Sequence, residues 1–274
     1  MGTESEGRRI EWIDFAKFSV MVLVICDHLG LENLLIANWI WSFHLPAFFF
    51  ISGMFFKPID GQKSLRELVK KDAYRLLLPV LLWYLIASVT WRPIDEYILH
   101  PDKAIASYLY HQVDFLEGFS MGFGWFMVAL FWIRFQSYLL FLPGKLFAFF
   151  MGFVFMPAIA YVVSGFIKLP YYLINSWMAI PFYYAGYLCK DLILEKISVI
   201  NRIKAFFISV ILFVITIASI PVLGHVSINA VVYGNSVILF YLIGLTGIFM
   251  MLFFSYSVYT RKFRHIYVLG GAQL

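Results

Sequence analysis

Long apolar runs recur along most of this chain, and they constrain its fold more than any other feature. A helix of about 20 apolar residues spans the roughly 30 Å hydrocarbon core of a bilayer. Only 14% of the residues are charged, against about 25% in soluble domains. The sequence therefore predicts an all-α, polytopic membrane bundle in one domain, residues 1–274, with about eight spans: 12–31, 36–56, 74–91, 122–142, 146–163, 173–189, 205–223 and 235–258.

Basic residues are distributed unequally between the two sets of connections. If the N-terminus is cytoplasmic, sixteen Lys and Arg side chains fall on the inner side, and three fall on the outer side: Arg92, Lys103 and Lys168. This bias indicates orientation in a membrane, so both termini are predicted to be cytoplasmic. It also accounts for the net charge of +5 without a nucleic-acid partner.

Two of the connections and the two cysteines support further predictions. Residues 57–75 are basic and predict a partly helical, interfacial cytoplasmic segment, whereas residues 92–121 form the largest predicted outer loop. Cys26 and Cys189 lie in different apolar runs, so both are interpreted as packing residues rather than as a disulfide. The N-terminal run contains charged residues and lacks a small-residue cleavage site, so no cleavable signal peptide is predicted.

The first span carries four ionisable residues, which are costly in hydrocarbon and therefore candidates for function: Asp14, Lys17, Asp27 and His28. Lys17 and His28 are 11 residues apart, so they project from nearly the same helix face, about 16 Å apart along the axis. Asp14 precedes Lys17 by three residues and can pair with it. The alternative is that Lys17 extends to the inner surface and His28 lies at the outer interface.

Two further polar residues lie within predicted spans. Arg134 falls near the middle of the fourth span, where it needs an acid, a carbonyl or an anionic ligand; Asp14 and Asp27 are the candidate acids for a structural pair. His44 precedes Pro46 by two residues, where backbone carbonyls freed by the proline can hold its ring. A packing role and a chemical role both remain open for His44.

Several motifs occur in order along the chain and resemble those of one family. Residues 9–17 (RIEWIDFAK), followed by ten residues and His28, resemble the first helix of the membrane-bound acyltransferase-3 family, which has a basic residue, ten residues and a histidine. Residues 43–53 (FHLPAFFFISG), 75–79 (RLLLP) and 124–130 (GWFMVAL) resemble its motifs in the second, third and fourth helices. The closest similarity is to the fucose 4-O-acetylase-like branch, which includes enzymes of surface-polysaccharide modification.

The resemblance implies O-acyl transfer, usually from cytoplasmic acetyl-CoA, to a hydroxyl of a sugar in a cell-surface polysaccharide or glycolipid. It implies a multi-pass protein of the bacterial inner (plasma) membrane, with acyl-CoA, a carbohydrate acceptor and the bilayer as partners and no metal. A histidine exchanges protons near neutral pH, so His28 is the candidate general base. Asp27 and His44 are further catalytic candidates.

Donor binding is expected to involve cations and an aromatic residue. CoA is polyanionic, so Lys17 and Arg75 are candidates for its phosphates. Arg134 and Trp125 complete the predicted donor-binding set. Relatives generally continue beyond the position of Leu274 into about two further helices, which are missing from this sequence. Alternative functions are a transporter or flippase for a lipid-linked saccharide, and an inactive, truncated homologue.

Overall fold

The protein is described here from a computed structural model, which defines residues 10–29, 33–59, 64–90, 97–98, 105–107, 109, 124–167 and 169–260. These residues are mostly helical, with two strands of two residues each, so the predicted all-α class is confirmed. They divide into two compact units that interleave along the sequence, a division that was not predicted.

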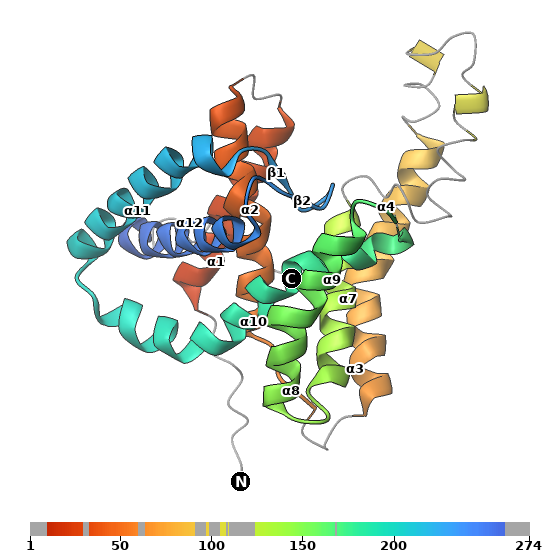
Figure 1. The fold of residues 1–274 in the computed structure, drawn as a ribbon, viewed down its shortest axis with the longest axis horizontal. Helices are drawn as coiled ribbons and strands as arrows, with labels where there is room; N and C mark the ends of the chain where they lie inside the picture. The colour runs from red at the N-terminus through yellow and green to blue at the C-terminus, as the bar shows by residue number, and fades with distance from the viewer. Residues whose placement is uncertain are drawn as a thin grey trace. The chain divides into compact units, whose positions relative to one another are not determined.

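Unit 1 comprises Met1–Phe55, Ala185–Ser227 and Tyr233–Leu274. Its main helices are α1 (Glu11–His28), α2 (Leu34–Met54), α11 (Arg202–Leu223) and α12 (Val237–Val258). Helix α12 packs against α11, α2 and α1, as Figure 1 shows for the blue α12 and its neighbours. The unit also contains the C-terminal part of α10 (Leu173–Lys196) and the turn η5 (Ile197–Val199).

Local sequence signals start the helices of unit 1, and a glycine brings two of them close together. The side chains of Asn33, Asn201 and Ser236 accept hydrogen bonds from backbone N–H groups in the first turns of α2, α11 and α12, as N-cap residues do. A Cβ atom at Gly247 in α12 would lie 2.5 Å from the Cβ of Phe43 in α2. The missing side chain therefore allows these two helices to approach closely.

Unit 2 comprises Phe56–Tyr184 and Ile228–Val232. Its elements are α3 (Leu65–Asp72), η1 (Ala73–Leu77), α4 (Leu78–Val89), α7 (Trp125–Leu140), α8 (Lys145–Phe150), η3 (Met151–Phe155), α9 (Met156–Val163), η4 (Pro170–Tyr172) and the start of α10. Helix α7 packs against α3, η1 and α8. Between α11 and α12, strands β1 (Val226–Ser227) and β2 (Val232–Tyr233) form a small hairpin.

Two membrane-length runs in unit 2 contain a π-helical turn. Helices α3 and α4 are continuous through η1, giving the run Leu65–Val89, and α8 and α9 are continuous through η3, giving Lys145–Val163. The predicted third span starts at residue 74, whereas the helical run begins at Leu65 with a Ser64–Glu67 capping box. Asp72, predicted to lie in a cytoplasmic connection, is therefore buried within this run.

Five helical runs in the described part of the chain are long and apolar enough to cross a membrane: Leu34–Met54, Leu65–Val89, Lys145–Val163, Arg202–Leu223 and Val237–Val258. They coincide with five of the predicted spans. The other three predicted spans are helical too, but α7 is shorter, and α1 and α10 are not among the five. Charged side chains in α1 explain its lower apolar character. The number eight therefore stays a prediction.

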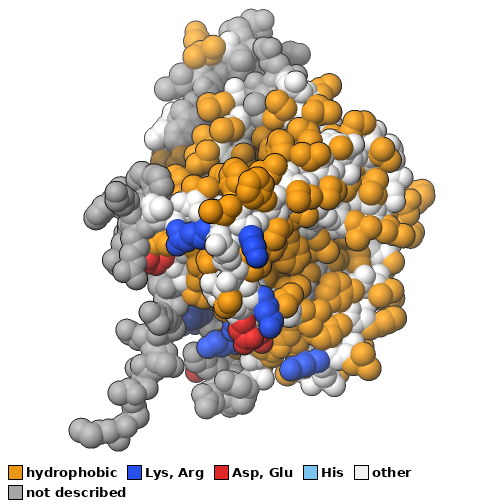
Figure 2. Space-filling model, turned by 90° about the vertical axis from the view of Figure 1, so that its left-hand side faces the viewer, with side chains coloured by type: hydrophobic (Ala, Val, Ile, Leu, Met, Phe, Trp, Pro, Cys, Tyr) orange, Lys and Arg blue, Asp and Glu red, His pale blue; other side chains and the backbone are white. Residues whose placement is uncertain are grey.

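The surface agrees with a membrane environment. On the face shown in Figure 2, apolar side chains predominate, and Lys and Arg side chains gather in the lower half of the view. Exposed apolar residues occur in turn after turn of α11, for example Phe207, Ile211 and Ile215. Such a face is stable in contact with lipid, whereas in water it would promote aggregation.

Both cysteines are free thiols, in agreement with the prediction.

Candidate functional site

A stripe of side chains along α1 joins the two residues of the family-like motif. Lys17, Met21, Val24 and His28 recur at intervals of three and four residues, so they share one face of the helix. The Lys17 side chain is 24% exposed and that of His28 is 45% exposed, and Met21 is exposed as well. The stripe is therefore accessible to a ligand over about 16 Å of helix length.

His28 is held in a defined orientation by its own helix. Its Nδ1 lies 2.9 Å from the backbone oxygen of Val24, one turn earlier. A carbonyl oxygen can only accept a hydrogen bond, so Nδ1 carries the proton of the neutral ring, and Nε2 is the basic atom. Asp27 Oδ2 lies 3.8 Å from Nδ1, which is beyond hydrogen-bonding distance. The Val24 carbonyl, rather than Asp27, therefore orients this ring.

Asp27 instead contacts a set of residues that sequence reasoning missed. Its Oδ1 accepts a hydrogen bond of 2.6 Å from Nε1 of Trp41 in α2. The indole of Trp41 contacts the ring of His225 edge-on, with centroids 5.3 Å apart, and His225 Nδ1 lies 3.0 Å from Asn38 Oδ1. We call Asp27, Asn38, Trp41 and His225 the outer polar cluster.

The outer polar cluster lies at the end of unit 1 where α1 and α11 finish and α2 begins. It combines a carboxylate, an amide, an imidazole and an aromatic face, which are groups that bind sugars through hydrogen bonds and stacking. The predicted topology places His225 on the same side of the membrane as His28. That shared side was the sequence signal that could have singled out His225.

His44 is buried inside α2. Its Nδ1 lies 2.7 Å from the backbone oxygen of Ile40, so this atom donates the hydrogen bond. A backbone carbonyl holds the ring as expected, but this carbonyl belongs to Ile40 and is not one that Pro46 frees. Pro46 lacks an N–H group and frees the carbonyl of Ser42, four residues earlier, rather than that of Ile40. The burial of His44 favours a packing role, and its catalytic role stays a prediction.

The opposite end of the stripe carries the predicted ion pair. Lys17 Nζ lies 3.5 Å from Asp14 Oδ1, and it also lies 5.4 Å from the centre of the Phe55 ring. Nearby helix ends of unit 1 are joined as well: the Tyr259 hydroxyl donates to Glu11, and Arg202 donates to the Tyr259 carbonyl over 2.6 Å. Segments predicted to be cytoplasmic therefore meet at one end of this unit.

Arg134, in unit 2, has a partner that the sequence did not suggest. Its Nε donates to Asp72 Oδ2 over 2.8 Å, and its Nη2 donates to the Tyr138 hydroxyl over 2.9 Å. The Tyr138 hydroxyl in turn donates to the same Asp72 oxygen over 2.8 Å. The expected pairing with Asp14 or Asp27 was wrong in its choice of acid. Asp72 comes from the helical run before α4, within the segment that the sequence predicts to be an interfacial connection.

The two other predicted donor-binding residues also belong to unit 2. Trp125 is buried at the start of α7 and packs against the ring of Tyr172, with centroids 5.7 Å apart. A Cβ atom at the preceding Gly124 would lie 2.5 Å from Val80, so glycine permits close contact between α7 and α4. Arg75 is exposed on the π-helical turn η1. Trp125 thus has a packing role in unit 2, and the donor contacts of both residues stay predictions.

Comparison with known proteins agrees with the motifs. No curated protein and no solved structure matches the chain significantly. The family described as the acyltransferase domain, of the acyltransferase-3 type, matches residues 10–272. This range contains α1 with Lys17 and His28, the outer polar cluster, and the Arg134–Asp72 pair. The chain therefore belongs to the acyltransferase-3 family and is a membrane acyltransferase.

Proposed function

We propose that the protein transfers an acyl group, most simply acetyl, from cytoplasmic acyl-CoA to a sugar hydroxyl of a surface polysaccharide or glycolipid in a bacterial plasma membrane. The observation that carries this proposal is the contact of His28 Nδ1 with the backbone oxygen of Val24, 2.9 Å away. The Nδ1–H of His28 is engaged by Val24, so Nε2 is the basic atom at an exposed end of α1. A base fixed in this way suits a hydroxyl acceptor, which is a poor nucleophile until its proton is removed.

The donor follows the α1 stripe in this proposal. Lys17 binds a phosphate of CoA at the cytoplasmic end of the stripe, where a cation suits a polyanion. The pantetheine arm runs past Met21 and Val24, and the thioester reaches His28. The stripe offers an apolar path between its two polar ends, which matches a ligand with a charged head and a thin, less polar arm.

The chemical step is a direct acyl transfer. His28 Nε2 takes the proton of the sugar hydroxyl as the oxygen attacks the thioester carbonyl carbon. The new C–O bond forms, the C–S bond breaks, and the CoA thiolate leaves and takes up the proton held on His28 Nε2, which regenerates neutral His28. Asp27, Trp41 and His225 hold the acceptor sugar next to this base, because the outer polar cluster starts at the residue adjacent to His28.

The test uses membranes that contain the full chain, with acetyl-CoA labelled in its acetyl group. Label should appear in surface glycan, and mass spectrometry should find O-acetyl esters that are absent without the protein. His28→Ala should lower transfer by about 10² to 10⁴-fold, the usual contribution of a positioned base. His44→Ala, with equal abundance of folded protein, is the matched comparison.

Three outcomes would reject parts of this proposal. If His28→Ala kept near-full transfer activity and His44→Ala lost it, the general base would be His44. Sugar-lipid movement across the membrane without incorporation of label would favour the transporter alternative. A folded wild-type protein that incorporates no label with any acyl-CoA would indicate an inactive homologue.

A further inference from the structure

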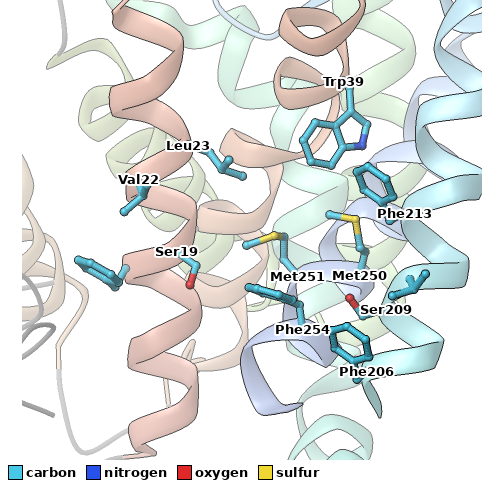
Figure 3. A pocket seen from close by; sticks show the side chains of 12 residues that line it. Ser19, Val22, Leu23, Trp39, Phe206, Ser209, Phe213, Met250, Met251 and Phe254 are labelled. Atoms are coloured by element: carbon cyan, nitrogen blue, oxygen red, sulfur yellow. The ribbon is translucent and has the colours of Figure 1, made fainter. Parts of the chain in front are cut away.

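A cavity of about 510 Å³ lies within unit 1, among α1, α2, α11 and α12. Figure 3 shows its lining, with Ser19, Val22 and Leu23 of α1 on one side and the side chains of α11 and α12 on the other. Its size falls within the roughly 300–1,000 Å³ range of sites for small ligands. Twelve side chains line it: Phe18, Ser19, Val22, Leu23, Trp39, Phe206, Ser209, Val210, Phe213, Met250, Met251 and Phe254.

This cavity is distinct from the stripe that we assign to the acyl donor. Successive helical residues are rotated by about 100°, so the four α1 residues of the cavity centre on the side nearly opposite Lys17 and His28. The stripe and the cavity therefore use two different faces of α1. A ligand in the cavity would not occupy the path between Lys17 and His28.

The lining offers a ligand few polar groups. None of the twelve lining side chains is charged, and five are aromatic. The hydroxyl of Ser19 donates to the Phe15 carbonyl over 2.9 Å, and Trp39 Nε1 donates to Thr216 over 3.0 Å, so both groups are satisfied within the protein. Water gains little in such a space, and an empty cavity loses dispersion contacts. A hydrocarbon ligand fits these walls best.

The position of the opening indicates where that hydrocarbon comes from. Five lining residues are 36% to 43% exposed: Val22, Phe206, Val210, Phe213 and Phe254. Four of them belong to α11 and α12, and Trp39 belongs to α2, all helices that are long and apolar enough to span a membrane. Val22, Val210 and Phe213 lie in the central turns of their helices, whereas Phe206 and Phe254 lie about one turn from an end of α11 and α12. The cavity therefore opens sideways into the bilayer.

We infer that this cavity binds one acyl chain of a bilayer phospholipid, which enters laterally between α1 and α11. Met250 and Met251 form its inner wall, and flexible thioether side chains adapt to a chain of irregular shape. The phospholipid is the source of the chain because it surrounds the opening at high local concentration. The bound chain fills space between α1 and α11 and holds α1 against the rest of unit 1.

The test separates a chain inside the cavity from the ordinary lipid around the protein. The full chain is reconstituted in phosphatidylethanolamine–phosphatidylglycerol vesicles that contain a phosphatidylcholine with a diazirine midway along one acyl chain. After irradiation, labelled positions are mapped by mass spectrometry. Surrounding lipid labels outward residues such as Ile211 and Ile215. Met250 and Met251 are only 4% and 7% exposed, so they are labelled only by a chain that enters the cavity.

A filled cavity provides the control. Ser209→Phe places a ring in the space and should lower labelling of Met250 and Met251 by about tenfold, equivalent to about 1.4 kcal/mol of binding free energy. Labelling of Ile215 should not change. Ile211→Phe places the same ring on the opposite side of α11 and should leave the methionines labelled. If Ser209→Phe does not fold, Ser19→Leu fills the cavity from α1 and carries the same expectation.

Two results would overturn the inference. Wild-type protein labelled at Ile211 and Ile215 but not at Met250 and Met251 would show that no chain enters. Displacement of the methionine label by a polyprenyl phosphate at concentrations where added phospholipid has no effect would assign the cavity to a carrier lipid instead. Neither result depends on acyltransferase activity, so failure here leaves the proposed function standing.

Discussion

Arg134 Nε donates a hydrogen bond of 2.8 Å to Asp72 Oδ2, linking α7 to the helical run that begins at Leu65. The Asp72 side chain is buried, and Tyr138 donates to the same carboxylate oxygen. The Phe56 ring contacts the rings of Tyr138 and Tyr183, with centroids 5.4 and 5.6 Å away. Tyr138 contacts both members of the ion pair, and the side chains of Arg134 and Asp72 are only 20% and 6% exposed, so loss of one partner leaves an uncompensated charge.

Arg134→Gln should destabilise the protein strongly. Removal of one partner from a buried ion pair typically costs about 3–5 kcal/mol because the remaining charge is stranded. The melting temperature in detergent should therefore fall, and Asp72→Asn in the Arg134→Gln background should restore most of it. If Arg134 also binds the donor, acetyl-CoA turnover should stay low in the double variant after stability returns.

Arg134→Lys is the matched control, because it keeps the charge but loses the planar group that contacts Asp72 and Tyr138 together. It should fall between wild type and Arg134→Gln in melting temperature. An Arg134→Gln protein as stable as wild type would contradict the structural role assigned to the pair.

Gly247→Ala should destabilise unit 1. A Cβ atom at this position would lie 2.5 Å from the Cβ of Phe43, and overpacking of this kind costs about 1–3 kcal/mol. This steric cost should exceed the roughly 1 kcal/mol that alanine gains over glycine in a helix. Gly165→Ala is the control, because the space around that position is open within 4 Å. Equal melting temperatures for the two variants would disprove close contact between α2 and α12.

Trp41 and Asp27 should be energetically coupled. The hydrogen bond between them involves a charged acceptor in a partly exposed site, so a double-mutant cycle with Trp41→Phe and Asp27→Ala should give about 1 kcal/mol. Trp39→Phe removes a similar indole, but one that donates to Thr216. The change in the free energy of unfolding caused by Trp39→Phe should add to that caused by Asp27→Ala within about 0.5 kcal/mol. Additivity in the Trp41 cycle as well would exclude the contact.

The membrane orientation can be measured with single cysteines in a background that lacks Cys26 and Cys189. A cysteine in residues 92–121 should react with an impermeant thiol reagent on intact cells, because the charge bias predicts that this segment is external. A cysteine in residues 57–75 should react only after the membrane is permeabilised. The reverse pattern would invert the predicted topology.

Sequence alone determined the helical class, because five runs of apolar residues are long enough to satisfy their backbone hydrogen bonds within a membrane. It also determined local geometry along a single helix. The Asp14–Lys17 pair and the shared face of Lys17 and His28 follow from helical periodicity, which requires no knowledge of neighbouring helices.

Tertiary structure decided which helix faces meet. In a membrane protein, faces toward lipid and faces toward other helices are both apolar, so hydrophobic periodicity does not distinguish them. The acid that pairs with Arg134 lies 62 residues away in the sequence, and His225 reaches the Trp41 ring from the far end of α11. The cavity between α1 and α11 has the same origin, because only the packing of four separate helices leaves space at Met250 and Met251.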